Sequence, residues 1–142
     1  MFILAAITTT SMTLAAGNIK KNDQQLTIKV KSNGCAESVV LASSADNCSG
    51  TEFAASCGKN GKDCVCMQNN KFVSWKVETD TRFELVFKGP SPFKSNCKMK
   101  SGNNGHLKCK IEAPDNDYDY DVILESCPSQ VYDPRIVLRT RD

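Results

Sequence analysis

Apolar and polar residues alternate with a period of two along much of this chain of 142 residues, and no other feature constrains the fold as strongly. Successive side chains of a β-strand point to opposite faces, so this alternation predicts strands buried on one face. The clearest example spans residues 117–125, where aromatic and aliphatic side chains alternate with carboxylates. The other alternating segments are 26–30, 73–77, 83–87, 107–111 and 136–138, with a less regular one at 37–42.

Turn-forming residues separate these segments. Residues 89–92, 101–105, 113–116 and 127–129 each contain Gly, Pro or Asn, which supply the backbone angles that turns need. Seven short strands at this spacing, without an amphipathic helix, predict an all-β fold. We expect an antiparallel, seven-stranded β-sandwich.

Eight cysteines and a single histidine accompany this pattern. An even set of cysteines in a short chain is typical of a disulfide-stabilised domain in an oxidising compartment. Cys97 and Cys109 flank the glycine-rich turn and are placed to close a hairpin. The disulfide candidates are Cys35, Cys48, Cys57, Cys64, Cys66, Cys97, Cys109 and Cys127.

Residues 43–70 hold four of these cysteines but few large apolar side chains, so we expect a disulfide-rich insertion between strands. Cys57, Cys64 and Cys66, with Met67 beside them, also offer soft sulfur ligands for Cu(I), or a redox dithiol. Structural disulfides are the favoured interpretation, because they are the usual state of an even cysteine set outside the cytoplasm. The sequence therefore predicts no metal site, with Cys57, Cys64 and Cys66 as the alternative.

The N-terminal residues 1–16 are uncharged, and the first lysine is Lys20. This segment is shorter than the roughly 20 apolar residues that span a bilayer, but it suits a secretory signal followed by small residues. We expect a signal peptide or an uncleaved N-terminal anchor at 1–16 and a single domain at 17–142. That predicts a secreted, periplasmic or cell-surface protein with no membrane span in the mature chain.

Charge is balanced and scattered, with a formal net charge of +2, which argues against a nucleic-acid partner. One strand face carries Asp117, Asp119 and Asp121, with carboxylates about 7 Å apart. Calcium needs converging oxygens, whereas a flat row diverges. We therefore expect the acids to pair with Lys108 and Lys110 of the preceding strand across an antiparallel ladder.

The part of the chain from 72 to 139 resembles exported bacterial proteins of the cupredoxin-like sandwich type. The residues that carry the likeness are 73–77, 83–87, 89–93, Tyr118, Tyr120 and 133–139. The resemblance implies a cupredoxin-like or immunoglobulin-like sandwich. It covers about half of the chain, and its motifs are specific as a set and weak one by one.

A type 1 copper site needs two histidines, one cysteine and usually an axial methionine. The resemblance places the first histidine ligand at Phe83, and the cysteine and second histidine at Val122 and Glu125. Cys127 follows closely, but no histidine comes after it. The resemblance therefore implies the fold without copper electron transfer, and we expect no cofactor.

Two further side chains are candidates for function. His106 falls on the polar phase of its strand, and without a placed nucleophile it is expected to be a surface residue. Trp75 falls on the inward phase and is expected to anchor the core. Asn47 opens a glycosylation motif, which matters only in a eukaryotic secretory pathway.

Three functions are compatible with these features. The first is a non-enzymatic exported domain for binding or cell-envelope structure, whose partner would be a protein or a glycan. The second is a thiol-based metal-handling or redox protein built on Cys57, Cys64 and Cys66. The third is a hydrolase that depends on His106 or the aspartate row. The first accounts for the cysteines, the missing ligands and the strand pattern together, so the sequence predicts it and assigns no catalytic residue.

Overall fold

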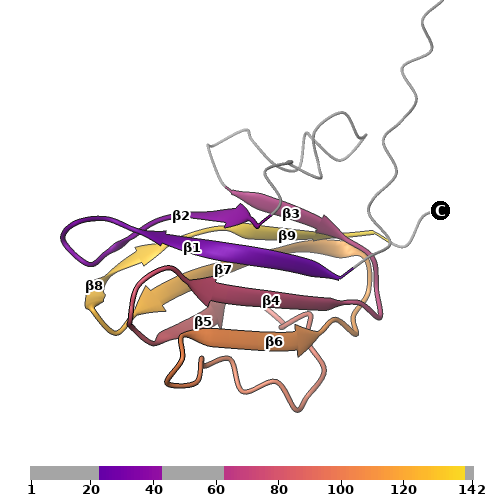
Figure 1. Ribbon diagram of the computed structural model, residues 1–142. Coiled ribbons are helices and arrows are strands. Elements are labelled where there is room, and N and C mark those ends of the chain that lie inside the picture. The colour runs from indigo at the N-terminus through magenta and orange to yellow at the C-terminus, as the bar shows by residue number, and fades with distance from the viewer. Residues whose placement is uncertain (1–22, 43–62, 140–142) are drawn as a thin grey trace, which may run out of the picture.

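The computed structural model describes residues 23–42 and 63–139, which form two β-sheets packed face to face (Figure 1). The strands are β1 (Gln24–Val30), β2 (Ala36–Leu41), β3 (Cys64–Met67), β4 (Phe72–Val77), β5 (Phe83–Phe87), β6 (His106–Lys110), β7 (Asn116–Leu124), β8 (Cys127–Tyr132) and β9 (Arg135–Leu138). One sheet has the order β2-β1-β4-β6, and the other has the order β3-β9-β7-β5, with β8 also paired to β7. The predicted all-β sandwich is confirmed.

The described residues contain nine strands rather than the seven that the alternation predicts. One additional strand, β3, lies inside the segment expected to be a cysteine-rich insertion, so that prediction is wrong for its C-terminal part. Val65, Cys66 and Met67 of β3 are at most 1% exposed, and the strand pairs with β9. The rest of that segment, with Asn47, Cys48 and Cys57, lies outside the described residues.

Strand direction also differs from the antiparallel expectation. β1 pairs with β4 in parallel, and β3 pairs with β9 in parallel, while the remaining strand pairs are antiparallel. Alternation of side chains reports which face of a strand is buried, but it carries no information about the direction of the neighbouring strand. The fold is therefore a sandwich of two mixed sheets.

The core between the sheets consists of the inward residues that the alternation predicts. Trp75 of β4 and Tyr120 of β7 are at most 1% exposed, and they meet across the two sheets. The Trp75 indole N–H donates a hydrogen bond to the Tyr120 hydroxyl over 3.1 Å. Phe93 packs edge-on against Trp75, and Phe87 stacks on Tyr120. Trp75 is thus the core anchor that the sequence indicates.

A second polar link joins the sheets near Asp63, directly before β3. Its Oδ2 accepts hydrogen bonds from the Val39 backbone N–H of β2, over 2.7 Å, and from the Tyr132 hydroxyl of β8, over 2.6 Å. Burial, together with the neighbouring Asp63 carboxylate, raises the pKa of Tyr132 well above its usual value. The phenol therefore stays protonated and keeps donating this bond at physiological pH.

Two disulfides cross-link the described chain. Cys35, in the turn between β1 and β2, is bonded to Cys127 at the start of β8, so this bond joins one sheet to the other. Cys97 is bonded to Cys109 of β6, the pairing that their position around the glycine-rich turn suggests. Cys64 and Cys66 are also disulfide-bonded, and none of the described cysteines is free.

The turn before β6 depends on Gly105. Its φ of 65° lies in the left-handed region, and an added Cβ would overlap the buried Val77 side chain and come within 2.9 Å of the Thr81 carbonyl oxygen. We expect Gly105→Ala to lower the free energy of unfolding by about 2–4 kcal/mol, from left-handed strain and overpacking together. Denaturation in urea measures the loss.

Gly89→Ala provides the matched control for this substitution. No atom lies within 4 Å of the position that its Cβ would take, so we expect the free energy of unfolding to change little. Equal losses in the two variants would contradict the steric explanation.

Candidate functional site

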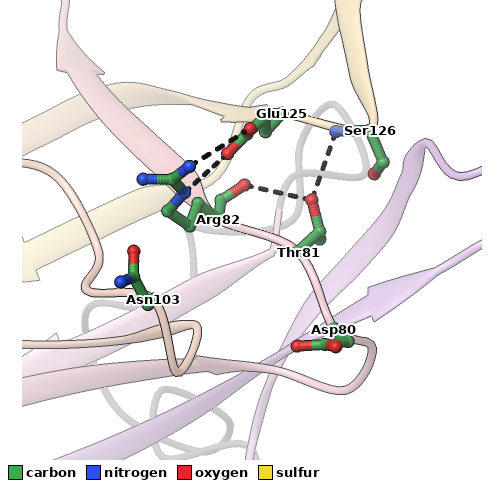
Figure 2. Close-up of a pocket in the computed structure, with 6 residues that line it drawn as sticks. All are labelled: Asp80, Thr81, Arg82, Asn103, Glu125 and Ser126. Carbon is green, nitrogen blue, oxygen red and sulfur yellow. Dashed lines mark hydrogen bonds and ion pairs between the residues drawn. The ribbon is translucent and has the colours of Figure 1, made fainter.

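Two open cavities adjoin each other where the turn before β5 meets the turn between β7 and β8. The first, here called the polar cavity, has a volume of about 470 Å³ (Figure 2). Every residue that lines it carries a hydrogen-bonding or charged side chain. These residues are Asp80, Thr81, Arg82, Asn103, Glu125 and Ser126.

An ion pair between Arg82 and Glu125 lies at the centre of the site (Figure 2). The Arg82 Nε donates to Glu125 Oε2 over 2.8 Å, and its Nη2 donates to Oε1 over 3.5 Å. Both side chains are more than half exposed. Exposed ion pairs contribute little to stability, so a ligand can replace either partner of this pair at a small cost in free energy.

The second cavity, here called the mixed cavity, has a volume of about 330 Å³ and shares Arg82 and Glu125 with the first. The ion pair is therefore the wall between them. Apolar side chains make up much of this lining, and Lys100 lies 3.9 Å from Glu84 at its edge. The remaining residues that line it are Phe83, Ser101, Ile123, Leu124 and Pro128.

Hydrogen bonds and disulfides hold the walls of both cavities in place. The Glu125 backbone N–H donates to the Arg82 carbonyl over 2.8 Å, and the Ser126 hydroxyl donates to the Gly34 carbonyl over 2.6 Å. Cys127, next to Ser126, is disulfide-bonded, and so is Cys97, on the segment that leads to Ser101. These links tie the backbone of the cavity walls to the rest of the sandwich, and restraint of this kind lowers the entropic cost of binding.

Strand register explains why Arg82 and Glu125 meet. β5 and β7 are antiparallel, with Phe83 opposite Leu124, so the next residues outward are Arg82 and Glu125. The alternation places Glu125 on the polar phase of its strand, and no sequence pattern indicates a role in binding for Arg82. A correct pairing of β5 with β7 would have identified both, whereas Asp80, Thr81, Asn103 and Ser126 lie in turns without a recognisable motif.

The resemblance places copper ligands at positions whose residues make other contacts in this structure. Phe83 is 3% exposed and Val122 is fully buried, so both are core residues. Glu125 pairs with Arg82, and Cys127 is bonded to Cys35. Phe83 and Glu125 both line the mixed cavity. This end of the sandwich therefore contains an open cavity, and the Arg82–Glu125 ion pair forms part of its lining.

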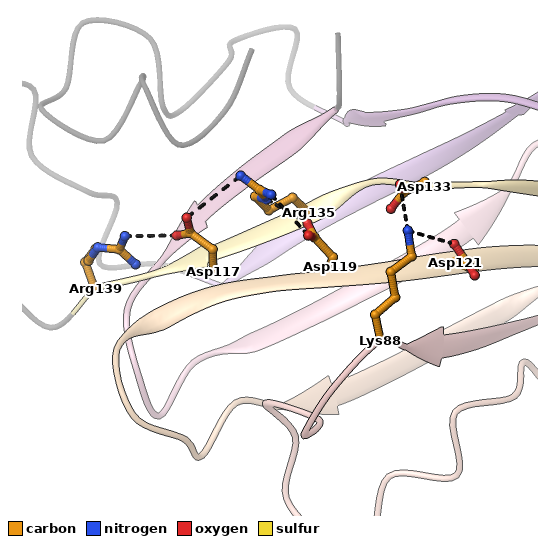
Figure 3. Close-up of polar contacts among 7 residues, drawn as sticks. All are labelled: Lys88, Asp117, Asp119, Asp121, Asp133, Arg135 and Arg139. Atoms are coloured by element: carbon orange, nitrogen blue, oxygen red, sulfur yellow. Dashed lines mark hydrogen bonds and ion pairs between the residues drawn. The ribbon is translucent and has the colours of Figure 1, made fainter. Parts of the chain in front are cut away.

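The row of aspartates on β7 pairs with cations, but not with those expected (Figure 3). Arg135 contacts Asp119 through two nitrogens, at 2.7 and 3.1 Å, and Arg139 donates to Asp117 over 2.9 Å. Lys88 lies 3.6 Å from Asp121. Pairing with Lys108 and Lys110 is wrong, because β6 belongs to the opposite sheet and pairs with β4.

Matched charges hold these cations in their protonated forms. The hydrogen bond that Lys88 donates to Asp133 raises the pKa of Lys88, and the one that Arg135 donates to Asp119 raises the pKa of Arg135. The carboxylate row therefore forms a charge-matched face, as the sequence predicts. Across the described ranges, no group of three or more His, Cys, Asp or Glu residues is arranged to hold a metal ion.

The other candidate residues lie apart from the cavities. His106 is exposed at the start of β6, as the alternation predicts, and lines neither cavity. Cys64 and Cys66 are disulfide-bonded, and Cys57 lies outside the described residues.

Comparisons with known proteins give structural similarity alone. No protein-family model matches the sequence, and no curated protein matches it. A reduced amicyanin mutant aligns at 15% identity over 61% of this chain and 90% of its own, with a TM-score of 0.32. Reduced rusticyanin aligns at 10% identity over 84% of this chain and 81% of its own, with a TM-score of 0.35.

A multi-copper oxidase from Pediococcus acidilactici aligns at 12% identity over 90% of this chain and 28% of its own, with a TM-score of 0.38. These scores are too low to assign a family, so the sandwich rests on its own strand order. A search of the described ranges for a helix long and apolar enough to cross a membrane found none.

Proposed function

We propose that this chain is a non-enzymatic binding domain of the cell envelope or the extracellular space, and that its ligand occupies the polar and mixed cavities. The Arg82–Glu125 ion pair, exposed between the two cavities, is the observation that carries this proposal. A ligand with hydroxyl or amide groups on one side and an apolar surface on the other matches such a lining. Short glycans and peptides have this chemistry.

Binding without catalysis accounts for the side chains of the site. General acid–base catalysis requires a proton-transferring group within hydrogen-bond reach of the reacting atoms. Glu125 already accepts from Arg82, and the single histidine of the chain, His106, lines neither cavity. Rigid walls and paired charges suit recognition, in which the ligand replaces existing partners.

Export accounts for the covalent cross-links. Disulfides persist in oxidising compartments, and Cys35–Cys127 and Cys97–Cys109 both brace the cavity walls. We propose that residues 1–16 direct export as a signal peptide, which places the domain in the periplasm, at the cell surface or in the medium. The disulfide bonds of Cys64 and Cys66 favour this role over thiol-based metal handling.

Titration of isotope-labelled protein with panels of soluble oligosaccharides and peptides tests the proposal. A binder should shift the amide resonances of residues 80–82, 103 and 125–126. The double variant Arg82→Ala/Glu125→Ala should weaken that binding by about tenfold or more, because hydrogen bonds to charged groups contribute about 1.5–3 kcal/mol each.

The double variant Asp117→Ala/Arg139→Ala is the control, since it removes an ion pair of similar length from the β7–β9 face. It should bind as the unaltered protein does. Shifts confined to other surfaces, or conversion of a panel member into product, would contradict a binding role for the cavities.

A further inference from the structure

The outer face of the β2-β1-β4-β6 sheet gathers positive charge. Side chains that alternate with the core residues point outward from β1, β4 and β6, and none of them is acidic. These residues are Gln25, Thr27, Lys29, Phe72, Ser74, Lys76, His106, Lys108 and Lys110. We call this surface the basic face, and it is separate from the cavities, since none of these residues lines either one.

Strand register places these cations beside one another. Lys76 of β4 lies opposite His106 of β6, and Lys108 lies opposite Ser74. Neighbouring strands are about 4.8 Å apart, and alternate residues of one strand are about 7 Å apart. The lysines therefore form a two-dimensional array across neighbouring strands.

Most of this charge has no acidic partner within the described chain. Lys29 is the exception, since its Nζ lies 3.3 Å from Glu78. A hydrogen bond from the Val30 backbone N–H lowers the pKa of Glu78, so this acid stays ionised beside Lys29. Among the described residues, no carboxylate lies within ion-pair distance of Lys76, Lys108 or Lys110, in contrast to the paired cations of the β7–β9 face.

An aromatic ring lies among the lysines. Phe72 opens β4 opposite Lys110 and is 37% exposed, although a residue of this size and polarity is normally buried. The Lys108 ammonium lies 4.8 Å from its ring centroid, a cation–π contact. Gln25 of β1 lies opposite Ser74 of β4; Ser74 is 8% exposed, whereas Gln25 is exposed and supplies an amide for hydrogen bonds.

We infer that the basic face binds an anionic polysaccharide, one that carries carboxylate or sulfate groups. The lysine array matches charges repeated along an extended polymer, the ring offers an apolar surface to the C–H face of a sugar, and the exposed Gln25 amide suits hydroxyl groups. This second binding surface is additional to the cavities, and its ligand class is argued from charge complementarity.

Other anionic partners fit this face less well. Nucleic-acid binding relies on arginines and on several stacking aromatics, whereas the outward residues of β1, β4 and β6 include no arginine and one aromatic ring. A membrane surface would be engaged by several exposed apolar residues beside the lysines. On the described part of this sheet face, Phe72 of β4 and Val40 of β2 are the exposed large apolar residues, and β1 lies between their strands, so they form no continuous apolar patch.

Binding of the full chain to immobilised dextran sulfate, alginate and neutral dextran tests this inference. We expect affinity for both anionic polymers but not for neutral dextran, and we expect it to fall as salt screens the charges. Reversal of two charges in Lys76→Glu/Lys108→Glu should weaken binding by about tenfold. Phe72→Ala should also weaken binding, but it should change the salt dependence of binding less than the double charge reversal does.

The control variant Lys88→Glu/Lys98→Glu makes the same change in net charge away from the basic face, since Lys88 follows β5 of the other sheet and Lys98 lies on the segment that leads to Ser101. It should retain the affinity of the unaltered protein. Equal losses in the two double variants would overturn the inference, because net charge alone would then explain binding. Binding to vesicles of phosphatidylglycerol but to neither anionic polymer would assign the face to a membrane and overturn it too, as would a failure to bind any anionic polymer at low salt.

Discussion

Replacement of both Cys35 and Cys127 by serine is expected to lower the free energy of unfolding by about 4 kcal/mol. This disulfide joins residues 92 positions apart and connects the turn between β1 and β2 to the start of β8. A cross-link that closes a long loop removes many conformations from the unfolded chain, so its loss favours unfolding. Chemical denaturation of the serine variant under non-reducing conditions measures the change.

The Cys97–Cys109 bond is the comparison, since it spans 12 residues. Its removal should cost about 3 kcal/mol, less than the loss of the longer loop. A reversed order would show that local strain or native contacts, rather than loop length, govern these cross-links. A count of free thiols on the unaltered protein accompanies this test, and two or more reactive thiols would restore the thiol-based function as a candidate.

Truncation of Trp75 to alanine is expected to lower the free energy of unfolding by about 3–5 kcal/mol, because it leaves a cavity between the sheets. The indole is fully buried between Phe93 and Tyr120. Thermal and urea denaturation give the loss, and the near-ultraviolet circular dichroism of the remaining aromatic residues reports whether the core stays ordered.

Tyr120→Phe separates the hydrogen bond from the packing. This variant keeps the ring but leaves the buried Trp75 indole N–H without its acceptor, which should cost about 1–3 kcal/mol. Burial raises the pKa of Tyr120 far above its usual value, so the phenol is neutral at working pH and the loss should be independent of pH there. A loss as large as that of Trp75→Ala would contradict this division between hydrogen bond and packing.

Long alternating segments made the core of this protein predictable. β7 has nine residues, and its inward side chains from Tyr118 to Leu124 are all buried, as the pattern indicates. The alternation did not predict β3, because this strand has four residues and three consecutive ones are buried, so burial does not alternate along it. β8 escaped because it begins Cys-Pro-Ser and exposes four consecutive residues, which is typical of a turn.

The partners of each strand were less predictable than its faces. β6 and β7 are consecutive in sequence, and a hairpin between them would have paired Lys108 and Lys110 with the aspartate row. They belong to different sheets instead, so Arg135 of β9 and Arg139, directly after β9, take that place. The candidate site was hidden for the same reason, since Arg82 meets Glu125 through the pairing of β5 with β7.

The position of β9 has a consequence for how the chain matures. β9 is the most C-terminal of the described strands, yet it lies inside its sheet, between β3 and β7. Until β9 inserts, β3 has no backbone partner on that side, and Cys64 and Cys66 are held by no neighbouring strand. Non-local pairings of this kind form slowly. We therefore expect correct cysteine pairing at β3 to depend on the insertion of β9, so that oxidation before β9 pairs with β3 would favour incorrect disulfides.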